Sequence, residues 1–456
     1  MHMNFKTTLV LALVLIVGIV AVVLLDKKDE QRAEQKELDE KLLNIEKENV
    51  SEIMLEPAGI HAVRDSNDWI LTDPVDARAD NDAINSLLGI FDYSKQIRVI
   101  SSDPSEYPVY GLQNPKAEMV LVHDGQSDTL YLGDDNPTGS YVFARQSGSP
   151  DVFLTSTAFK TQATKTLFDL RNKNVVPFDR MALNHLTIRN ENGRFVFEKQ
   201  AGAWELVEPI AYPVDETEMD EIINNLYKGK AKEFVAESPD DLSQFGLENP
   251  DYTAELLLGD EKAQKRLLIG KSLGDQRYAK DSSRDPVFVV DKAFMDKFQF
   301  DLTAVRKKEI TDATSSQIRR FVLEHSGMTI EAELDSVANW NVLQPEKRPA
   351  KSWEAKSITA AIDRLKVQEF ADDNPASLAT YGLANPQVKA QFFDREKLLL
   401  ELHIGNIKDD LVYAKKADQN NVFLIDDNIL DTLTPDLEKL AESPEADTTA
   451  APAMLQ

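Results

Sequence analysis

The sequence predicts an N-terminal transmembrane helix followed by three tandem homologous α+β domains with mostly antiparallel sheets. Its length of 456 residues corresponds to about three domains of ~150 residues each. An apolar run occupies residues 9–25. The motif Tyr/Phe-Gly-Leu-x-Asn-Pro occurs three times, beginning at Tyr110, Phe245 and Tyr381. Together these features indicate a membrane anchor that carries three copies of one domain.

The first element is the predicted anchor, residues 1–25. All residues from Leu9 to Leu25 are apolar, with Gly18 as the only break, and 17 residues of helix span about 26 Å of the roughly 30 Å hydrocarbon core. A buried core helix would carry a polar stripe, and a cleaved signal peptide would end in small residues, whereas this run ends Leu24-Leu25-Asp26. We therefore expect an uncleaved single-pass helix that contacts the lipid bilayer through residues 9–25.

The charges beside the apolar run leave the orientation of the anchor open. Lys6 precedes the run, whereas Lys27, Lys28 and Arg32 follow it, and the positive-inside rule read literally would keep the large C-terminal part in the cytoplasm. Long domains, however, are translocated largely regardless of flanking charge. Both orientations are therefore compatible with the charge pattern.

Two further segments flank the predicted domains. Residues 26–48 are dense in Asp, Glu, Lys and Arg without Gly or Pro, and Leu38, Leu42 and Ile45 recur at helical spacing, which predicts a charged helical stalk. Residues 441–456 are dominated by Glu, Ala, Thr and Pro, a composition that is typical of a disordered tail.

The internal repeat defines the three domains. The motif glycines are spaced by 246 − 111 = 135 and 382 − 246 = 136 residues, and three tryptophans, each followed five residues later by a proline, keep the same period. This period is too long for a solenoid unit and indicates duplicated domains at residues 49–178, 179–312 and 313–440. The residues that we assign to the repeated architecture are Trp69, Trp204, Trp340, Gly111, Pro115, Gly246, Pro250, Gly382 and Pro386.

Each unit has the pattern of a small α+β domain. In the second copy, Asn192-Gly193 between two apolar runs predicts a β-hairpin, and the strand that carries Trp204 is expected to end at the following proline. In each unit a helix follows the tryptophan strand, and a polar loop leads from this helix to the repeated motif. Helices are predicted at residues 80–91, 215–227 and 357–365. In the third copy, strands are predicted at residues 388–393, 398–404, 411–415 and 422–425, and a closing helix at 427–433.

The repeated motif has a structural explanation. Proline biases the preceding Asn toward extended backbone and starts a strand, glycine permits a positive φ, and the aromatic residue and Leu can fill the core. We interpret the motif and the three tryptophans as architecture, with a docking surface as the alternative for the motif.

Composition excludes several classes of function. The chain has 51 Lys and Arg against 78 Asp and Glu, and its net charge of −27 repels phosphate backbones, so we expect no nucleic acid as a partner. The absence of cysteine excludes disulfides, thiolate metal sites and cysteine nucleophiles. Gly270-Lys271-Ser272 resembles the end of a phosphate-binding loop, but Lys265 stands where the first glycine is required, and the repeat makes this segment a strand-end turn.

No arrangement of residues in the sequence names a reaction. The histidines share neither a common place in the repeats nor a ligand-like spacing, and the acidic pairs lack the alternation of a calcium loop. We expect no catalytic residue, no cofactor and no metal. Arg145, Lys280 and Lys415 keep the repeat period, so they could line a weak shared binding face; charges on the solvent side of a strand are the alternative.

With these features the sequence resembles a bacterial envelope family known as a domain of unknown function. The resemblance rests on the single N-terminal anchor, the repeated motif and the Trp-x-Leu/Val-x-x-Pro strand, and it covers residues 49–440. It implies anchoring in the bacterial inner membrane with periplasmic domains, and genes that often lie beside those of Gld-type ABC-transporter auxiliary and permease proteins. It supplies no catalytic residues to transfer.

The leading hypothesis is a non-enzymatic accessory or scaffold subunit of an ABC-type transport or envelope-assembly complex, with an ABC permease or auxiliary subunit as its membrane partner. Three similar modules provide an extended surface or spacer, whereas an active site needs only one module. The alternative is a periplasmic carrier of lipid or another apolar ligand, which would need a continuous apolar groove. A hydrolase is the third hypothesis, and it would need convergent polar residues in one repeat.

Overall fold

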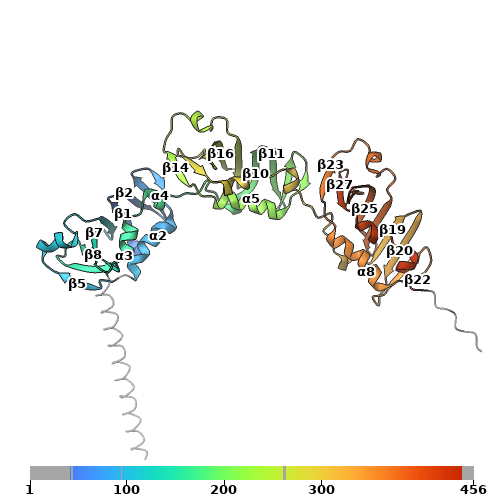
Figure 1. Ribbon diagram of the computed structural model, residues 1–456, viewed down its shortest axis with the longest axis horizontal. Coiled ribbons are helices and arrows are strands. Elements are labelled where there is room, and N and C mark those ends of the chain that lie inside the picture. Colours follow the sequence, from blue (N-terminus) through green and yellow to red (C-terminus); the bar gives the residue numbers. More distant parts are fainter. Residues whose placement is uncertain (1–41, 43–44, 94, 260–262, 444–456) are drawn as a thin grey trace, which may run out of the picture. The chain divides into compact units, whose positions relative to one another are not determined.

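The computed structural model describes Leu42 and residues 45–93, 95–259 and 263–443. Three nine-stranded sheets follow one another along this part of the chain, one in each repeat (Figure 1). The chain divides into two compact units, and the middle repeat contributes strands to both. The first unit takes in the described residues of 1–177, 228–249 and 270–291, and the second takes in those of 178–227, 250–269 and 292–456.

The strands are short and correspond one to one between the repeats. Repeat 1 has β1 (Val50–Glu56), β2 (Ile60–Asp65), β3 (Asp68–Asp73), β4 (Ala77–Arg78), β5 (Arg98–Ser101), β6 (Ala117–His123), β7 (Gln126–Asp135), β8 (Tyr141–Gln146) and β9 (Val152–Ser156). Repeat 2 has β10 (Leu183–Asn190), β11 (Gly193–Gln200), β12 (Ala203–Glu208), β13 (Tyr212–Pro213), β14 (Glu233–Ala236), β15 (Tyr252–Leu258), β16 (Ala263–Leu273), β17 (Gln276–Asp281) and β18 (Val287–Val290). Repeat 3 has β19 (Arg320–His325), β20 (Met328–Leu334), β21 (Trp340–Gln344), β22 (Arg348–Pro349), β23 (Glu369–Asp372), β24 (Val388–Asp394), β25 (Lys397–Lys408), β26 (Leu411–Lys416) and β27 (Val422–Asp426).

The strand order is the same in every sheet. Repeat 1 has the order β4-β3-β2-β1-β6-β7-β8-β9-β5, and repeats 2 and 3 reproduce it with their own strands. Paired strands run antiparallel; in the central pair of repeat 1, Ile53 lies opposite Leu121. β5, β14 and β23 each form one edge of their sheet, although each is the fifth of the nine strands of its repeat along the sequence. The prediction of three α+β domains with mostly antiparallel sheets is thereby confirmed.

Short helices complete each repeat. Repeat 1 has α2 (Asn81–Gly89), α3 (Thr157–Ala163) and α4 (Leu167–Leu170), repeat 2 has α5 (Glu216–Lys228), α6 (Lys292–Asp296) and α7 (Leu302–Val305), and repeat 3 has α8 (Ser352–Ala360), α9 (Ile429–Leu433) and α10 (Leu437–Leu440). α2 begins where Asp80 accepts a hydrogen bond from the Ala83 N–H, and it buries Ile84, Leu87 and Leu88 on one stripe. This stripe joins the same core as the buried side chains of the sheet.

The repeated motif builds a tight turn after a short 3₁₀ helix. These helices are η3 (Pro104–Tyr110), η5 (Ser243–Phe245) and η8 (Leu378–Tyr381), and the glycine after each has a positive φ of 69°, 70° or 72°. The aromatic residue of the motif packs on a second ring of its own repeat, at 4.8–5.1 Å between centroids. Strands β6, β15 and β24 start two residues after Pro115, Pro250 and Pro386, as predicted.

A second glycine in each repeat lies against this turn. Gly133, Gly270 and Gly405 lie inside β7, β16 and β25, so the prediction of a strand-end turn at Gly270 is wrong. A Cβ at these three positions would lie 2.2, 2.3 and 2.1 Å from the carbonyl oxygen of the motif aromatic. Glycine is therefore required because the backbone of the motif turn packs directly on the strand.

The tryptophan strands end where the sequence predicts. β3, β12 and β21 end at Asp73, Glu208 and Gln344, the residues before the three prolines, and each of these X–Pro bonds is cis. Trp69 and Trp340 are buried, whereas Trp204 is only half-buried. The prediction that the tryptophans are core residues is therefore confirmed in repeats 1 and 3, whereas the tryptophan of repeat 2 is only partly buried.

Several predicted boundaries differ from the structure. α8 begins at Ser352, whereas the sequence predicted a start at residue 357. The true start was missed because the N-cap residue, Lys351, has no side-chain acceptor that would mark it in the sequence. The predicted polar loop contains the edge strands β5, β14 and β23. Leu42 and Ile45, which we assigned to the stalk, join the core of repeat 1, and Ala441, which we assigned to the tail, is fully buried in repeat 3.

The predicted anchor, most of the predicted stalk and nearly all of the predicted tail lie outside the described residues. Within the described ranges, no helix is both long and apolar enough to cross a membrane.

A buried histidine in repeat 3 gives a pH dependence to stability. His325 on β19 is 6% exposed, and burial lowers its pKa below the usual 6.5, so the folded state disfavours the charged form. The unfolded chain then binds the proton more tightly, and stability falls as pH drops below about 6.5. We expect His325→Asn to flatten the decline in the unfolding midpoint between about pH 7.5 and 5. Parallel curves for the two proteins would contradict this assignment.

Candidate functional site

The strongest shared geometry lies where one repeat joins the next. After α4 and after α7, a short linker runs beside the segment that precedes the edge strand of the following repeat. In the first unit, the Val175 N–H donates to the Gly229 carbonyl at 2.9 Å and the Ala231 N–H donates to the Lys173 carbonyl at 2.7 Å. In the second unit, the Val367 N–H donates to the Lys308 carbonyl at 2.8 Å. We call these contacts junction 1 (linker residues 171–176) and junction 2 (linker residues 306–311).

A buried arginine holds junction 1. Arg171 directly follows α4, and its side chain is 4% exposed. Its two terminal nitrogens donate to the two carboxylate oxygens of Glu237, just after β14, at 2.7 and 2.8 Å. Its guanidinium also lies 3.7 Å from the ring centroid of Phe234 on β14. Arginine suits this position because its planar fork binds a carboxylate through two hydrogen bonds while its face stacks on an aromatic ring.

Junction 2 repeats the arrangement with equivalent residues. Arg306 directly follows α7, is 1% exposed, and donates to the Asp373 carboxylate at 2.6 and 3.3 Å. Its guanidinium lies 3.6 Å from the centroid of Phe370 and 4.3 Å from that of Tyr212. The spacings 306 − 171 = 135, 373 − 237 = 136 and 370 − 234 = 136 match the repeat period. We call each set of arginine, carboxylate and phenylalanine an arginine clamp.

The clamp residues do not occur in all three copies of the repeat. The position of Arg306 in repeat 3 holds Ala441 (306 + 135), and the positions of Glu237 and Phe234 in repeat 1 hold Ser102 and Val99 (237 − 135 and 234 − 135). Each clamp therefore needs an arginine from one repeat and an acceptor from the next, which is the pattern expected when the residues serve to join domains.

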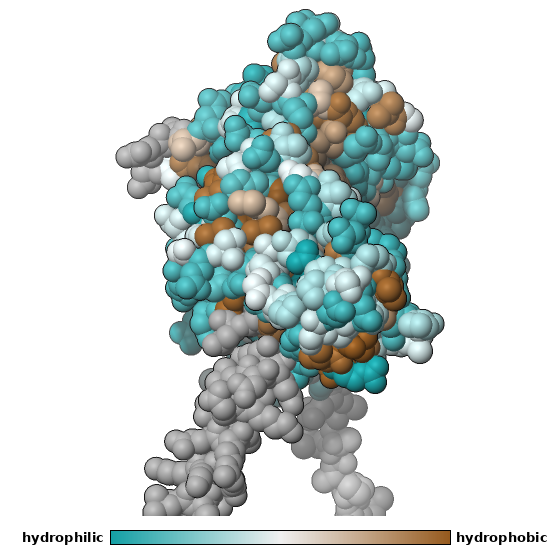
Figure 2. Space-filling view, turned by 90° about the vertical axis from the view of Figure 1, so that its left-hand side faces the viewer, coloured by the Kyte–Doolittle hydropathy of each residue, from teal (hydrophilic) through white to brown (hydrophobic). Residues whose placement is uncertain are grey.

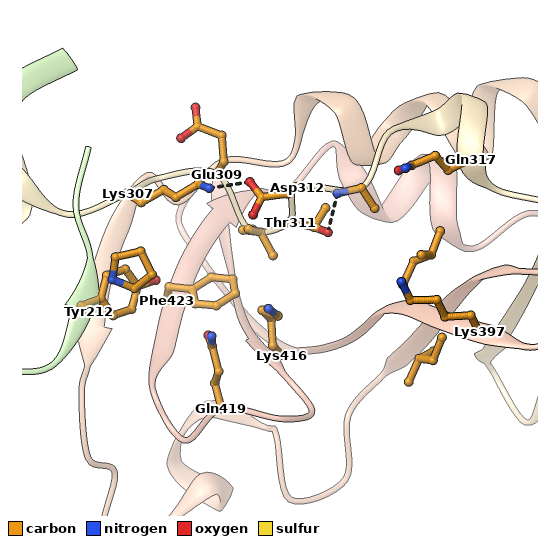
Figure 3. Close-up of a pocket in the computed structure, with 15 residues that line it drawn as sticks. Tyr212, Lys307, Glu309, Thr311, Asp312, Gln317, Lys397, Lys416, Gln419 and Phe423 are labelled. Carbon is orange, nitrogen blue, oxygen red and sulfur yellow. Dashed lines mark hydrogen bonds and ion pairs between the residues drawn. The ribbon is translucent and has the colours of Figure 1, made fainter. Parts of the chain in front are cut away.

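A cavity of about 430 Å³ lies in the second unit at junction 2. Figure 3 shows the side chains of Lys307, Lys397 and Lys416 around it, with Tyr212 and Phe423 among its aromatic lining. Lys307 pairs with Asp312, and the neighbouring Glu309 pairs with Lys366 at 2.8 Å. The hydrogen bond from Lys366 lowers the pKa of the Glu309 carboxyl, and burial raises the pKa of the Tyr212 hydroxyl. The cavity therefore combines fixed ion pairs, aromatic surface and two further lysines.

The three charged residues that the sequence marked as a weak binding face contact only their own repeats in the interactions described. The Arg145 guanidinium lies over the rings of Tyr131 and Tyr107. The Lys280 ammonium donates to the Arg284 and Asp285 carbonyls, and the Lys415 ammonium donates to the Lys416 carbonyl at 2.7 Å. Burial lowers the pKa of both lysines. Arg145 therefore stacks on aromatic rings of its own repeat, whereas Lys280 and Lys415 donate to backbone carbonyls at the ends of β17 and β26.

Repeat 1 exposes apolar side chains around β5, the strand that corresponds to β14 and β23 of the clamps. Tyr93 (69% exposed), Ile97 (52%), Val99 (45%) and Val109 (73%) lie on β5 and on the segments before and after it. We call these four residues the β5 face. Repeat 2 has Lys228 and repeat 3 has Arg364 at the position of Tyr93. Figure 2 faces the side that lies at the left of Figure 1, where β5 is labelled, and shows brown apolar groups interrupting a largely hydrophilic surface.

Other chemistry is not apparent in the part of the chain that the structure describes. No group of three or more His, Asp or Glu side chains there could hold a metal ion. Among the same residues, the histidines lie in three different repeats, as at His123, His185 and His403, each with its own local partner.

The fold and junctions define a tandem-repeat protein of three homologous α+β domains joined by arginine clamps. A family model described as "Domain of unknown function (DUF4340)" matches residues 69–203, 204–374 and 340–444. Because these matches cover more than half of the chain, the protein belongs to this family. The matches start at the three tryptophans, so each one begins inside a sheet, and the first two run on into the next repeat. No curated protein and no solved structure matches the chain.

The family match confirms the expected family of unknown function with tandem repeats; the gene neighbourhood and the membrane location that the resemblance implied stay predictions. Sequence reasoning missed Arg171, Arg306, Glu237 and Asp373. The available signal was a basic residue and a carboxylate that keep the repeat period in two of the three copies. A search for charges present in all three copies cannot find it, because a clamp needs a repeat on both sides.

Proposed function

We propose that this protein is a non-enzymatic, single-pass protein of the bacterial inner membrane with periplasmic repeats. It serves as an accessory or scaffold subunit of an ABC-type transport or envelope-assembly complex. The proposal rests on the apolar run at residues 9–25, on the family resemblance, and on the surface that the first repeat presents.

The observation that carries the proposal is the β5 face. Repeats 2 and 3 use the corresponding edge to receive the preceding linker and its arginine, whereas in repeat 1 the exposed apolar residues are Val99 on β5, Tyr93 and Ile97 before it, and Val109 in η3 after it. Exposed apolar groups of this size on one edge are typical of protein-binding surfaces. The absence of an acceptor carboxylate at Ser102 favours an apolar partner segment over a cationic one.

The arginine clamps support a scaffold role. They join the repeats through buried arginines, each with two hydrogen bonds to a partly exposed carboxylate, so the repeats resist independent movement at the clamped edges. A scaffold that holds a membrane partner and a distant site at a fixed separation needs such joints. A chain that only tethers independent domains does not need them. This use of the duplication requires all three repeats.

Purification from the native membrane in a mild detergent, followed by mass spectrometry, tests the proposal. We expect a stoichiometric ABC permease, ATPase or auxiliary subunit to accompany the full-length protein. Ile97→Asp combined with Val109→Asp is expected to release this partner, because two charges would be buried in an apolar contact.

Val337→Asp is the matched control, because Val337 is 72% exposed in repeat 3, far along the sequence from the β5 face. It should leave the partner bound. Recovery of the protein alone with one defined lipid would favour the carrier instead, and retention of the partner by the double variant would exclude the β5 face as the contact.

A further inference from the structure

The two junctions differ at one place, although their clamps are alike. In repeat 2 the turn after β17 carries Arg284, whose Nη2 donates to the Val175 carbonyl at 3.1 Å and to the Asn174 carbonyl. Asp281, which is fully buried, lies 3.4 Å from the Arg284 guanidinium. Arg284 therefore spans from its own turn to the linker backbone and fills the space between them.

Repeat 3 replaces both members of this pair. The position of Arg284 holds Gln419 (284 + 135), and the position of Asp281 holds Lys416 (281 + 135). The linker residues that Arg284 contacts in junction 1 correspond to Glu309 and Ile310 (174 + 135 and 175 + 135), and both of these line the cavity of about 430 Å³. The cavity thus occupies the place that an arginine fills at junction 1.

The same replacement changes the charge of this place. An Asp–Arg pair has no net charge, whereas Lys416 with Gln419 has one positive charge. Lys397, at the start of β25, adds a second, and among the described residues it forms no ion pair; the carboxylate paired with Lys416 is the exposed Asp418, 3.8 Å away. Lys307 and Glu309 are neutralised by Asp312 and Lys366. The lining therefore has a local positive charge within a chain of net charge −27.

The apolar part of the lining indicates what the ligand carries beside its anionic group. Ile310, Leu398, Leu399 and Phe423 line the same cavity as the two lysines, and Leu398 is 46% exposed. A ligand that fits both features carries a phosphate or carboxylate group next to an aliphatic chain. Figure 3 shows Lys416 beside Gln419 and Phe423, and Lys397 further along the lining toward Gln317, so the positive charge is spread along the cavity.

We propose that the cavity at junction 2 is a binding site for a phosphate or carboxylate group attached to an apolar chain, with Lys416 contacting the anionic group and Lys397 adding positive charge further along the lining. The loss of the arginine that fills junction 1 creates the space, and the exchange of Asp for Lys supplies the charge. The site is independent of the partner proposed for the β5 face, because its residues lie in a different unit.

Binding of inorganic phosphate and of hexyl phosphate to the full-length protein in a neutral detergent tests this site by calorimetry. We expect both to bind, hexyl phosphate more tightly, and added salt to weaken both. Lys397→Gln combined with Lys416→Gln should weaken binding at least tenfold. Lys389→Gln, a partly exposed lysine of the same repeat that is not part of the cavity, should leave it unchanged.

The decisive variant introduces into junction 2 the two residue types that occupy the equivalent positions in junction 1. Lys416→Asp combined with Gln419→Arg restores the pair that repeat 2 already folds with, and it should abolish binding while the unfolding midpoint is kept. Equal affinity for the two probes would overturn the apolar part of the proposal and leave a site for a free phosphate rather than for a lipid headgroup. The absence of binding by the unmodified protein, or full binding by the rebuilt variant, would overturn the proposal.

Discussion

Replacement of Gly405 by alanine is expected to destabilise repeat 3 by about 3 kcal/mol. Gly405 lies in the interior of β25, where a Cβ would lie 2.1 Å from the Tyr381 carbonyl oxygen and 3.0 Å from Leu383 Cγ. The nearest atom is backbone, and it belongs to a turn held by Gly382 at φ 72°, so it cannot move aside without loss of the turn. The measurement is thermal unfolding together with hydrogen exchange of the repeat 3 amides.

Two other glycines serve as controls, because they distinguish the effect of this steric clash from the general effect of replacing a glycine by alanine. Gly327 has φ 76° with open space around its Cβ position, so Gly327→Ala should cost about 1–2 kcal/mol from backbone strain alone. Gly89 has a helical φ of −61° and equally open space, so Gly89→Ala should be neutral or slightly stabilising. If Gly405→Ala cost no more than Gly327→Ala, the close packing of motif and strand would not be the reason for the glycine.

Removal of the carboxylate of the second clamp is expected to cost about 2–3 kcal/mol. Asp373→Ala leaves the guanidinium of Arg306, 1% exposed, without its ion-pair partner, and a buried unpaired charge is far more costly than a lost surface pair. The linker should open as well, because the Val367 N–H is bonded to the Lys308 carbonyl beside the clamp. Faster exchange of the Val367 amide and faster tryptic cleavage at Lys307 and Lys308 would report this opening.

Neighbouring substitutions make the test specific. Glu369 begins β23, the strand that ends directly before Asp373, but its partner Lys408 is 42% exposed, so Glu369→Ala should cost no more than about 1 kcal/mol. Asp373→Glu restores the residue type found at Glu237 in junction 1 and should keep most of the stability. An equal loss for Asp373→Ala and Glu369→Ala would contradict the view that the clamp carries the junction.

The clamps change how the duplication is understood. A family built from one repeated domain could use its copies as independent beads, and the sequence period alone is compatible with that arrangement. Arg171 and Arg306 are instead buried against the next repeat, and their acceptors Glu237 and Asp373 keep the period. The two junctions then diverge at one position: Arg284 donates to the linker backbone in junction 1, whereas Gln419 lines a cavity in junction 2.

Local sequence patterns determined the repeat and most of its elements. The prolines after Trp69, Trp204 and Trp340 end their strands, and the motif prolines precede β6, β15 and β24, because proline restricts the backbone on both sides of itself. The start of α8 at Ser352 was missed because no capping side chain marks it. The edge strands β5, β14 and β23 were missed because a four-residue strand in a polar segment has no periodicity to detect.

By itself, the sequence determined that this chain holds three copies of one α+β domain, because the spacing of glycine, tryptophan and proline is a property of the chain read in order. Only the tertiary structure decided how the copies are joined. The clamp brings together Arg306 and Asp373, 67 residues apart, and the cavity brings together β13, β25 and the linker. Such contacts depend on the strand order, which returns β14 and β23 to the far edge of their sheets, and no local pattern encodes that return.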